Sequence, residues 1–149
     1  MSGELVIRPL QPEDRARWSP LWDSYLAFYR SALRPEITDA TFARFFDSLE
    51  PMHALVAEQD DRLIGFAHYL LHRSTWAQHC YCYLEDLFVD PNVRGKGTGR
   101  ALITGVTDAA RAAKASRVYW VTEDSNVQAQ TLYDKVAGRP GFIQYRIKL

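Results

Sequence analysis

The chain has 149 residues, of which 47% are hydrophobic and 24% are charged, and its formal net charge at pH 7 is +0. This composition is typical of one globular domain, residues 1–149, and the balanced charge argues against a general binder of nucleic acids or other polyanions. Because residues 1–4 lack a secretory pattern and no apolar run approaches the ~20 residues that span a bilayer, we expect a soluble cytoplasmic protein.

The first fifty residues are predicted to contain one strand and two helices. Residues 4–8 have the apolar character of a short strand. Residues 12–29 place aromatic and leucine side chains on one broad helical face, with Pro20 either interrupting this helix or beginning its second half. Thr38 or Asp39 can cap a second, shorter helix that carries several phenylalanines.

Strands dominate the middle of the chain. Residues 54–58, 63–71 and 81–89 are rich in apolar and aromatic side chains, and a hairpin turn is predicted at residues 59–61. An amphipathic helix then extends to about residue 115.

The C-terminal part is predicted to add a strand, a helix and a final strand. Residues 117–122 are typical of a buried strand, and residues 126–136 have helical spacing. Residues 142–149 alternate between apolar and polar side chains, which predicts a half-buried antiparallel strand. The resulting order, β-α-α-β-β-β-α-β-α-β, indicates a mixed α/β fold.

The cysteine and histidine residues show no metal-binding pattern. Cys80 and Cys82 stand two apart in a strand-like segment, a spacing that suits neither a disulfide nor a zinc site, so we expect free, packed thiols. His68 and His72 are four apart, but in a strand rather than a helix. We therefore expect no metal.

A glycine-rich loop lies between the strand that ends at Val89 and the amphipathic helix. Its glycines and cations alternate closely: Arg94, Gly95, Lys96, Gly97, Gly99 and Arg100. Glycine allows the backbone to approach a ligand, and a helix N-terminus offers free N–H groups to an anion. The loop therefore predicts a pyrophosphate site held mainly by backbone. Neither the dinucleotide fingerprint nor the Walker spacing is present.

The remaining pattern, Arg-x-x-Gly-x-Gly from Arg94 to Gly99, resembles the acetyl-CoA loop of the GNAT superfamily of N-acetyltransferases. A second segment, from Asn126 to Tyr133, is similar to the family motif Asn-x-x-Ala-x-x-x-Tyr. The element order also matches the family. The resemblance implies the GNAT fold, with a central, mostly antiparallel sheet that is splayed at the cofactor strand and flanked by about four helices. It also implies acetyl-CoA as co-substrate.

The resemblance further assigns the cofactor-binding residues and an oxyanion partner. We expect the following residues to bind the cofactor: Leu87, Phe88, Val89, Arg94, Gly95, Lys96, Gly97, Thr98, Gly99, Arg100 and Asn126. Backbone N–H groups between Leu87 and Val89 are the candidate oxyanion donors. Asn126 either caps its helix or contacts the pantetheine arm, and one residue can do both.

Glu85 is the candidate catalytic base. It is a carboxylate in an otherwise apolar strand just before the glycine loop, where partial burial would raise its pKa. Its position resembles the glutamate of Leu-Glu-Asp in the spermidine/spermine N-acetyltransferase branch, which has a base role there. The alternative is a carboxylate that only attracts the cationic amine. Asp86 should face the opposite side of a regular strand and is more readily interpreted as structural.

Tyr133 is the candidate catalytic acid, because the family's motif tyrosine reaches the cofactor sulfur. A phenol with a pKa near ~10 is a weaker acid than a thiol near ~8.5, so proton transfer is uphill by about 2 kcal/mol. Tyr133 would therefore act chiefly as a hydrogen-bond donor. The alternative is a tyrosine that only packs in the core.

The substrate side is less specific. Trp22, Tyr25, Tyr29, Tyr83 and Glu85 could form an aromatic, acidic pocket for a small cation, although ordinary core packing is the favoured interpretation for most of these rings.

The interpretation is an N-acetyltransferase that moves the acetyl group of acetyl-CoA to a primary amine of a small molecule, such as a polyamine or an amino acid. Direct attack in a ternary complex is favoured, because no cysteine has a nucleophilic context near the motifs. The alternatives are a protein lysine or N-terminal acetyltransferase and a non-catalytic acyl-CoA sensor. The expected partners are the small amine and a possible second copy of the chain, with no nucleic acid and no membrane.

Overall fold

The computed structural model describes residues 3–93 and 96–149, which form one mixed sheet with helices on both faces. In chain order the elements are β1 (Val6–Pro9), a 3₁₀ turn (Pro12–Asp14), α1 (Arg15–Phe28), α2 (Pro35–Arg44), β2 (Met52–Gln59), β3 (Arg62–His72), β4 (Cys80–Val89), a second 3₁₀ turn (Pro91–Val93), α3 (Thr98–Ala112), β5 (Ala115–Tyr119) and α4 (Val127–Val136). The mixed α/β prediction is confirmed, as is the number of flanking helices.

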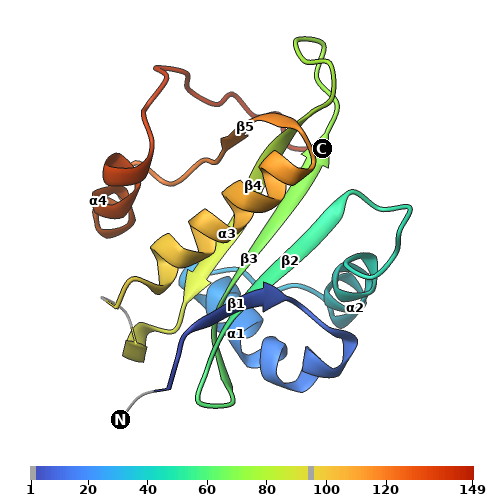
Figure 1. The fold of residues 1–149 in the computed structure, drawn as a ribbon, viewed down its shortest axis with the longest axis vertical. Helices are drawn as coiled ribbons and strands as arrows, with labels where there is room; N and C mark the ends of the chain where they lie inside the picture. The colour runs from blue at the N-terminus through green and yellow to red at the C-terminus, as the bar shows by residue number, and fades with distance from the viewer. Residues whose placement is uncertain (1–2, 94–95) are drawn as a thin grey trace.

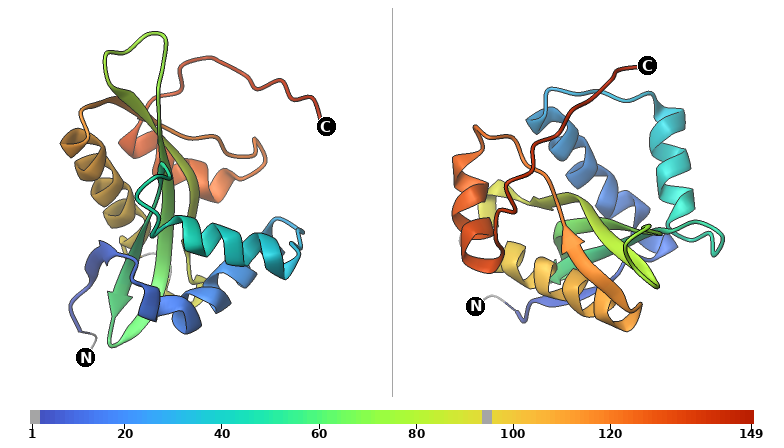
Figure 2. Two further views of the ribbon diagram at one scale, coloured as in Figure 1. Left: turned by 90° about the vertical axis from the view of Figure 1, so that its right-hand side faces the viewer. Right: turned by 90° about the horizontal axis from the view of Figure 1, so that it is seen from above.

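The five strands follow the order β1-β2-β3-β4-β5, with every neighbouring pair antiparallel except β4 and β5, which are parallel. Helix α3 covers one face of the sheet, and α1 and α2 cover the other (Figures 1 and 2). Each face buries its own apolar cluster. Leu102 and Val106 of α3 belong to the first cluster, and Trp18 of α1 packs with Phe66 of β3 in the second. No helix in the described part of the chain is long and apolar enough to cross a membrane.

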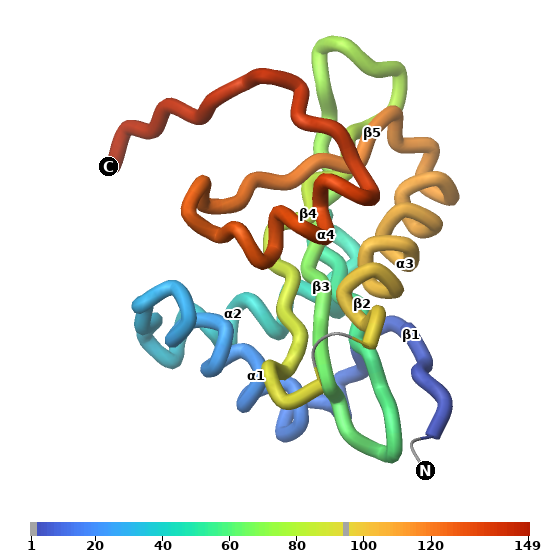
Figure 3. The backbone as a smooth tube through the Cα atoms, turned by 90° about the vertical axis from the view of Figure 1, so that its left-hand side faces the viewer, coloured from blue at the N-terminus to red at the C-terminus, as the bar shows by residue number. Residues whose placement is uncertain are grey.

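Strands β4 and β5 pair only at one end. Their ladder runs from Cys80↔Ala115 to Tyr83↔Tyr119, whereas β4 continues to Val89. Beyond the ladder, α4 lies beside the second half of β4, on the same side of the strand as β5 (Figure 3). The divergence expected at the cofactor strand is therefore present, and it leaves room for a ligand.

A cluster of ion pairs fixes α1 against the sheet. The buried Asp14 accepts hydrogen bonds from Arg8 of β1 and Arg17 of α1, and both arginines also bind Glu58 of β2. Hydrogen bonds from Arg8 are the main reason that the pKa of Asp14 is lowered to about 2. Since the carboxylate and its partners come from three elements, the cluster sets the position of the helix that borders the site described below.

Three predicted details are wrong in instructive ways. Helix α2 begins at Pro35 with Arg34 as its N-cap, not at Thr38 or Asp39, because proline has the backbone angle that a first helical turn requires. Helix α1 continues through Pro20. The strand predicted as buried is the edge strand β5, which is only partly covered.

The strand predicted at residues 142–149 is also wrong. No regular element is assigned there, and the side chains of Phe142, Ile143, Tyr145 and Ile147 are at least 77% exposed. Figure 2 shows this segment extending away from the body of the protein. Alternation predicts which side of a strand is apolar, but a strand forms only where another strand supplies hydrogen-bond partners.

Candidate active site

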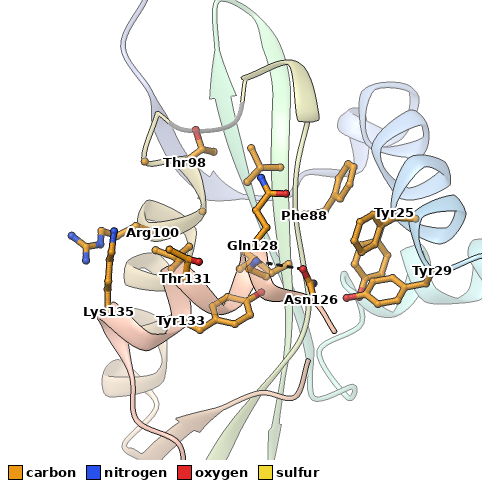
Figure 4. Close-up of a pocket in the computed structure, with 17 residues that line it drawn as sticks. Tyr25, Tyr29, Phe88, Thr98, Arg100, Asn126, Gln128, Thr131, Tyr133 and Lys135 are labelled. Carbon is orange, nitrogen blue, oxygen red and sulfur yellow. Dashed lines mark hydrogen bonds between the residues drawn. The ribbon is translucent and has the colours of Figure 1, made fainter. Parts of the chain in front are cut away.

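A cleft of about 530 Å³ opens where β4 and β5 diverge. Its walls are the C-terminal half of α1, the end of β4, the first turn of α3 and the inner face of α4 (Figure 4). On β4 the lining residues are Leu87, Phe88 and Val89, which are three of the expected cofactor contacts. The walls are mostly apolar, with polar side chains contributed by α1, α3 and α4.

The first turn of α3 closes one end of the cleft. Gly97 is the N-cap, with a left-handed φ of 83° that favours glycine, and among the described residues other than its chain neighbours nothing lies within 4 Å of where a Cβ would stand. Thr98, Gly99 and Arg100 also line the cleft, and a Cβ on Gly99 would come within 3.2 Å of Leu132. The free N–H groups of a helix N-terminus therefore border this end, where an anion is favoured.

Two cations lie at this end of the cleft. Arg100 of α3 and Lys135 of α4 both line the cleft, and Figure 4 labels them. Lys96 is exposed and does not line the cleft. Arg94 and Gly95, which the loop motif singled out, lie outside the described residues.

Helix α4 presents Asn126 and Tyr133 to the middle of the cleft (Figure 4). Asn126 is the N-cap, and its side-chain oxygen accepts a hydrogen bond of 3.4 Å from the Ala129 amide. Its expected capping role is therefore confirmed. Tyr133 packs edge-on against Trp120, with ring centroids 5.4 Å apart. Burial, and to a smaller extent Tyr29, raises the pKa of Tyr133 to about 12, so its hydroxyl keeps its proton at any working pH.

Glu85 lies next to this cleft rather than in it. It lines a smaller hollow of about 20 Å³, and Tyr25, Tyr29 and Tyr133 line both spaces. Although Glu85 keeps contact with solvent, partial desolvation raises its pKa, and the neighbouring Asp86 carboxylate raises it further. Glu85 and Tyr133 thus line the same hollow.

Asp86 does not face the opposite side from Glu85, so that expectation is wrong. In the ladder between β3 and β4, His68 pairs with Asp86 and Tyr69 pairs with Leu84, which leaves Glu85 as the extra residue of a β-bulge. The bulge reverses the alternation, and Asp86 points toward α1, where its carboxylate accepts a hydrogen bond of 2.8 Å from the Tyr25 hydroxyl. The carboxylate of Asp86 is held by two side chains, Tyr25 and His68, which agrees with the structural role predicted for it.

Several lining residues were not predicted. They come from the inner face of α4 and the end of α1: Phe28, Gln128, Ala129, Thr131, Leu132 and Lys135. Ala129 stands four residues before Tyr133, and this helical spacing is visible in the sequence and could have indicated a shared face, whereas Gln128, Thr131 and Lys135 share a different face of the helix. Tyr25 and Tyr29 line the cleft, in agreement with the predicted aromatic pocket. Trp22 is instead buried in the apolar cluster that contains Trp18 and Phe66.

The model of the Acetyltransferase (GNAT) family matches residues 18–138 of the chain. Among characterised relatives, the D-amino-acid N-acetyltransferase HPA3 of Saccharomyces cerevisiae is 36% identical over 148 residues, covering 98% of this chain and 92% of the relative. The thialysine N-epsilon-acetyltransferase of Sus scrofa is 33% identical over 95 residues, covering 58% of this chain and 55% of the relative.

The fold is also found among solved structures. The aminoglycoside N-acetyltransferase AAC(6')-Iy in complex with CoA superposes with a TM-score of 0.85, at 17% sequence identity, covering 97% of this chain and 95% of that one. At this identity the likeness concerns the fold. It includes the mixed sheet and the helices that enclose the cleft.

Proposed function

The chain belongs to the Acetyltransferase (GNAT) family and is an acetyl-CoA-dependent acyltransferase, and we propose that it acetylates the primary amine of a small molecule by direct attack in a ternary complex. The observation that carries the proposal is the junction of two spaces. A cleft of about 530 Å³ meets a small hollow that is lined by Glu85, and three tyrosines belong to both.

An amino acid is the substrate class we favour within small amines. The relative HPA3, which aligns over nearly the whole chain, is named for D-amino acids, and the shorter match is named for thialysine. The hollow at Glu85 is small and lined by aromatic rings, which suits a compact cation better than a polypeptide. A protein lysine or N-terminus and a non-catalytic acyl-CoA sensor are not favoured.

The cleft residues fit acetyl-CoA by their chemistry. The first turn of α3, with Arg100 and Lys135 nearby, suits the pyrophosphate. The apolar end of β4 suits the pantetheine arm, and the backbone N–H groups between Leu87 and Val89 are the proposed oxyanion donors. When bound, acetyl-CoA supplies the acetyl group as an activated thioester.

Glu85 and Tyr133 are the proposed catalytic residues. An alkylammonium with a pKa near ~10 loses its proton at pH 7 at a cost of about 4 kcal/mol, so a base at the hollow lowers the barrier. Glu85 accepts this proton directly or through water. The amine nitrogen then bonds to the acetyl carbon, the carbon–sulfur bond breaks, and the nitrogen loses its second proton to solvent. The Tyr133 hydroxyl donates a hydrogen bond to the leaving sulfur.

We predict that Glu85→Gln lowers kcat/KM at pH 7 about a hundredfold, as expected for loss of a general base. In the unchanged protein the rate falls as pH drops through the raised pKa of Glu85, because only the carboxylate accepts a proton. In the variant the rate should instead follow the free amine, rising about tenfold per pH unit toward the amine pKa. Initial rates from pH 5 to 10 measure both profiles.

Glu123→Gln is the matched control, because it removes one negative charge whose field also reaches the site, at Tyr29. Its profile should keep its shape. If Glu85→Gln raised KM for the amine and left the profile unchanged, Glu85 would attract the amine without acting as a base.

The function itself is tested by release of free thiol from acetyl-CoA. The panel should include D- and L-amino acids, polyamines, aminoglycosides and a lysine peptide. We expect turnover with one or more amino acids. Tight acetyl-CoA binding with no turnover of any small amine, or turnover of the peptide alone, would refute the proposed substrate class.

We further propose that the protein is a homodimer in which the segment 142–149 packs against a second copy. Ile143, Tyr145, Ile147 and Leu149 form one apolar side of this segment, and all four are exposed. β5 ends the sheet within the described residues, so its outer edge can accept another strand. An exposed alternating segment and an open sheet edge are complementary by β-addition.

The expected result is that Ile143→Asp with Ile147→Asp converts a dimer into a monomer in sedimentation velocity experiments. The control pair, Gln144→Asp with Lys148→Gln, changes the net charge by the same amount on the polar side and should remain dimeric. A monomeric unchanged protein, or a dimer unaffected by the isoleucine variants, would contradict the proposal.

A cytoplasmic location is also proposed. Cys80 and Cys82 are both free, which accords with a reducing compartment. Burial raises the pKa of Cys82 to about 11, so this thiol is unreactive near neutral pH.

A further inference from the structure

A chain of hydrogen bonds runs from the core of the protein to the candidate active site. Trp18 Nε1 donates to His68 Nε2 at 3.1 Å, and His68 Nδ1 lies 2.9 Å from one oxygen of Asp86. The other oxygen of Asp86 accepts the 2.8 Å bond from Tyr25. Trp18 and His68 are buried, whereas Tyr25 lines both the cleft and the hollow.

The direction of the first two bonds in this chain follows from the Trp18 donor. Indole nitrogen only donates, so His68 Nε2 must accept, and the proton of the neutral ring is on Nδ1. That proton is donated to Asp86, and Asp86 therefore accepts at both oxygens. The Tyr25 hydroxyl has its proton directed to Asp86, which leaves its oxygen lone pairs to accept hydrogen bonds.

The same series of hydrogen bonds lies at the β-bulge in which Glu85 is the extra residue. His68 is the β3 residue that pairs with Asp86 immediately beside the extra residue. Without the bulge, Asp86 would point to the α3 face, into an apolar cluster that contains Leu84 and Leu87. Burying a carboxylate there without partners is costly, whereas on the α1 face it meets two donors. The bulge in turn leaves Glu85 on the same side as Asp86, in the hollow.

We propose that His68 is a positioning residue for acetyl transfer: through Asp86 and Tyr25 it holds the bulge that places Glu85 beside the substrate amine. This inference rests on the proposed function. His68 touches neither the cleft nor the hollow, so it acts only through its neighbours. Trp18, at the buried end, determines which nitrogen of His68 carries the proton.

Other titratable groups also face Glu85, and a pH experiment must take account of them. They come from α1, β4 and α4, and they are Tyr25, Tyr29, Tyr83, Asp86 and Tyr133. Among these, Asp86 is the only carboxyl group, so its charge is the one whose removal should lower the pKa of Glu85.

The first test compares His68→Phe with His68→Gln. Phenylalanine fills the ring's space but removes both bonds, whereas glutamine keeps one donor and one acceptor. For His68→Phe we expect kcat to fall at least tenfold, with KM for acetyl-CoA within threefold of the unchanged protein. For His68→Gln we expect kcat within threefold. His53→Phe, on the neighbouring β2, is the control for loss of a histidine and should retain full activity.

The second test is Asp86→Asn, which remains informative if His68→Phe fails to fold. The amide keeps the shape but removes the negative charge beside Glu85, so the acid limb of the kcat profile should move to lower pH. It also offers only one accepting oxygen to the two donors, so kcat on the plateau should fall. His68→Gln should leave the position of the limb unchanged.

The outcomes separate this inference from the proposed function. If the unchanged protein acetylates an amine, and both His68 variants match His53→Phe in kcat at a temperature where all are folded, the positioning role is overturned. A tenfold loss in His68→Phe that His68→Gln does not rescue would also overturn it, because shape rather than hydrogen bonding would be responsible. If the unchanged protein acetylates no amine, the proposed function has failed first.

Discussion

Replacing Gly97 with tryptophan is expected to abolish acetyl-CoA binding, with a rise in Kd of at least a hundredfold, or about 3 kcal/mol. Gly97 is the N-cap of α3 and lines the cleft at the end where the pyrophosphate is proposed to bind. Apart from Gly97 and its chain neighbours, no atom of the described residues lies within 4 Å of its Cβ position, so the indole would enter the ligand's space rather than the core. Isothermal titration with acetyl-CoA measures the effect.

Gly141→Trp is a closely matched control. Gly141 also has a positive φ, 86° against 83° for Gly97, and open space at its Cβ position, but it does not line the cleft. Both variants should therefore show the same loss of thermal stability from backbone strain, on the order of 1–2 kcal/mol. If Gly97→Trp bound acetyl-CoA within threefold of the unchanged protein, the α3 terminus would not be the cofactor site.

Tyr133→Phe is expected to lower kcat about a hundredfold while the Kd for acetyl-CoA stays within threefold. The two side chains have the same shape apart from the hydroxyl, so the cleft and the contact with Trp120 are retained. The variant loses the hydroxyl that donates a hydrogen bond to the leaving sulfur. Because negative charge develops on the sulfur only in the transition state, this loss lowers kcat and leaves cofactor binding unchanged. Single-turnover rates with saturating acetyl-CoA, together with titration of the cofactor, separate turnover from binding.

Tyr69→Phe removes a hydroxyl from a buried tyrosine on β3 that does not line the cleft, and it should leave kcat unchanged. Equal turnover in Tyr133→Phe and Tyr69→Phe would exclude a catalytic role for the Tyr133 hydroxyl. A loss confined to cofactor affinity would assign this hydroxyl to binding alone.

The pKa of Tyr133 decides between two descriptions of that role. With a value of about 12 for the phenol and ~8.5 for a thiol, complete proton transfer to the thiolate is uphill by about 5 kcal/mol. Hydrogen-bond donation to the developing charge has no such cost. Tyr133 is therefore proposed to stabilise the leaving sulfur as a donor, and the released thiolate takes its proton from solvent.

The sequence alone indicated most of the cofactor side. The alternating glycines before an amphipathic helix, and the spacing of Asn126 and Tyr133 on a second helix, predicted two elements that the structure places on either side of one cleft. Such motifs are readable because backbone conformation and helical spacing are local properties. Lys135 lies on the same helix as Tyr133, but that it lines one cleft together with Arg100 depends on how α4 packs against α3.

The substrate side was predicted less well, because it depends on pairing between distant segments. The direction of Asp86 could not be read from β4 itself, since the bulge arises from the register against His68 on β3 and from donors on α1. For the same reason Trp22, Tyr25 and Tyr29 looked alike in the sequence, although one is in the core and two reach the site.

By itself the sequence determined the mixed α/β order, the glycine loop and the two motif residues of α4, since each depends on neighbours within a few positions along the chain. Only the tertiary structure decided that β4 carries a bulge at Glu85, that three tyrosines join the cleft to the hollow, and that residues 142–149 are left without a strand partner. Local sequence sets the conformational preference of each segment. Register, burial and strand pairing are settled by long-range contacts between segments, and these contacts create the site.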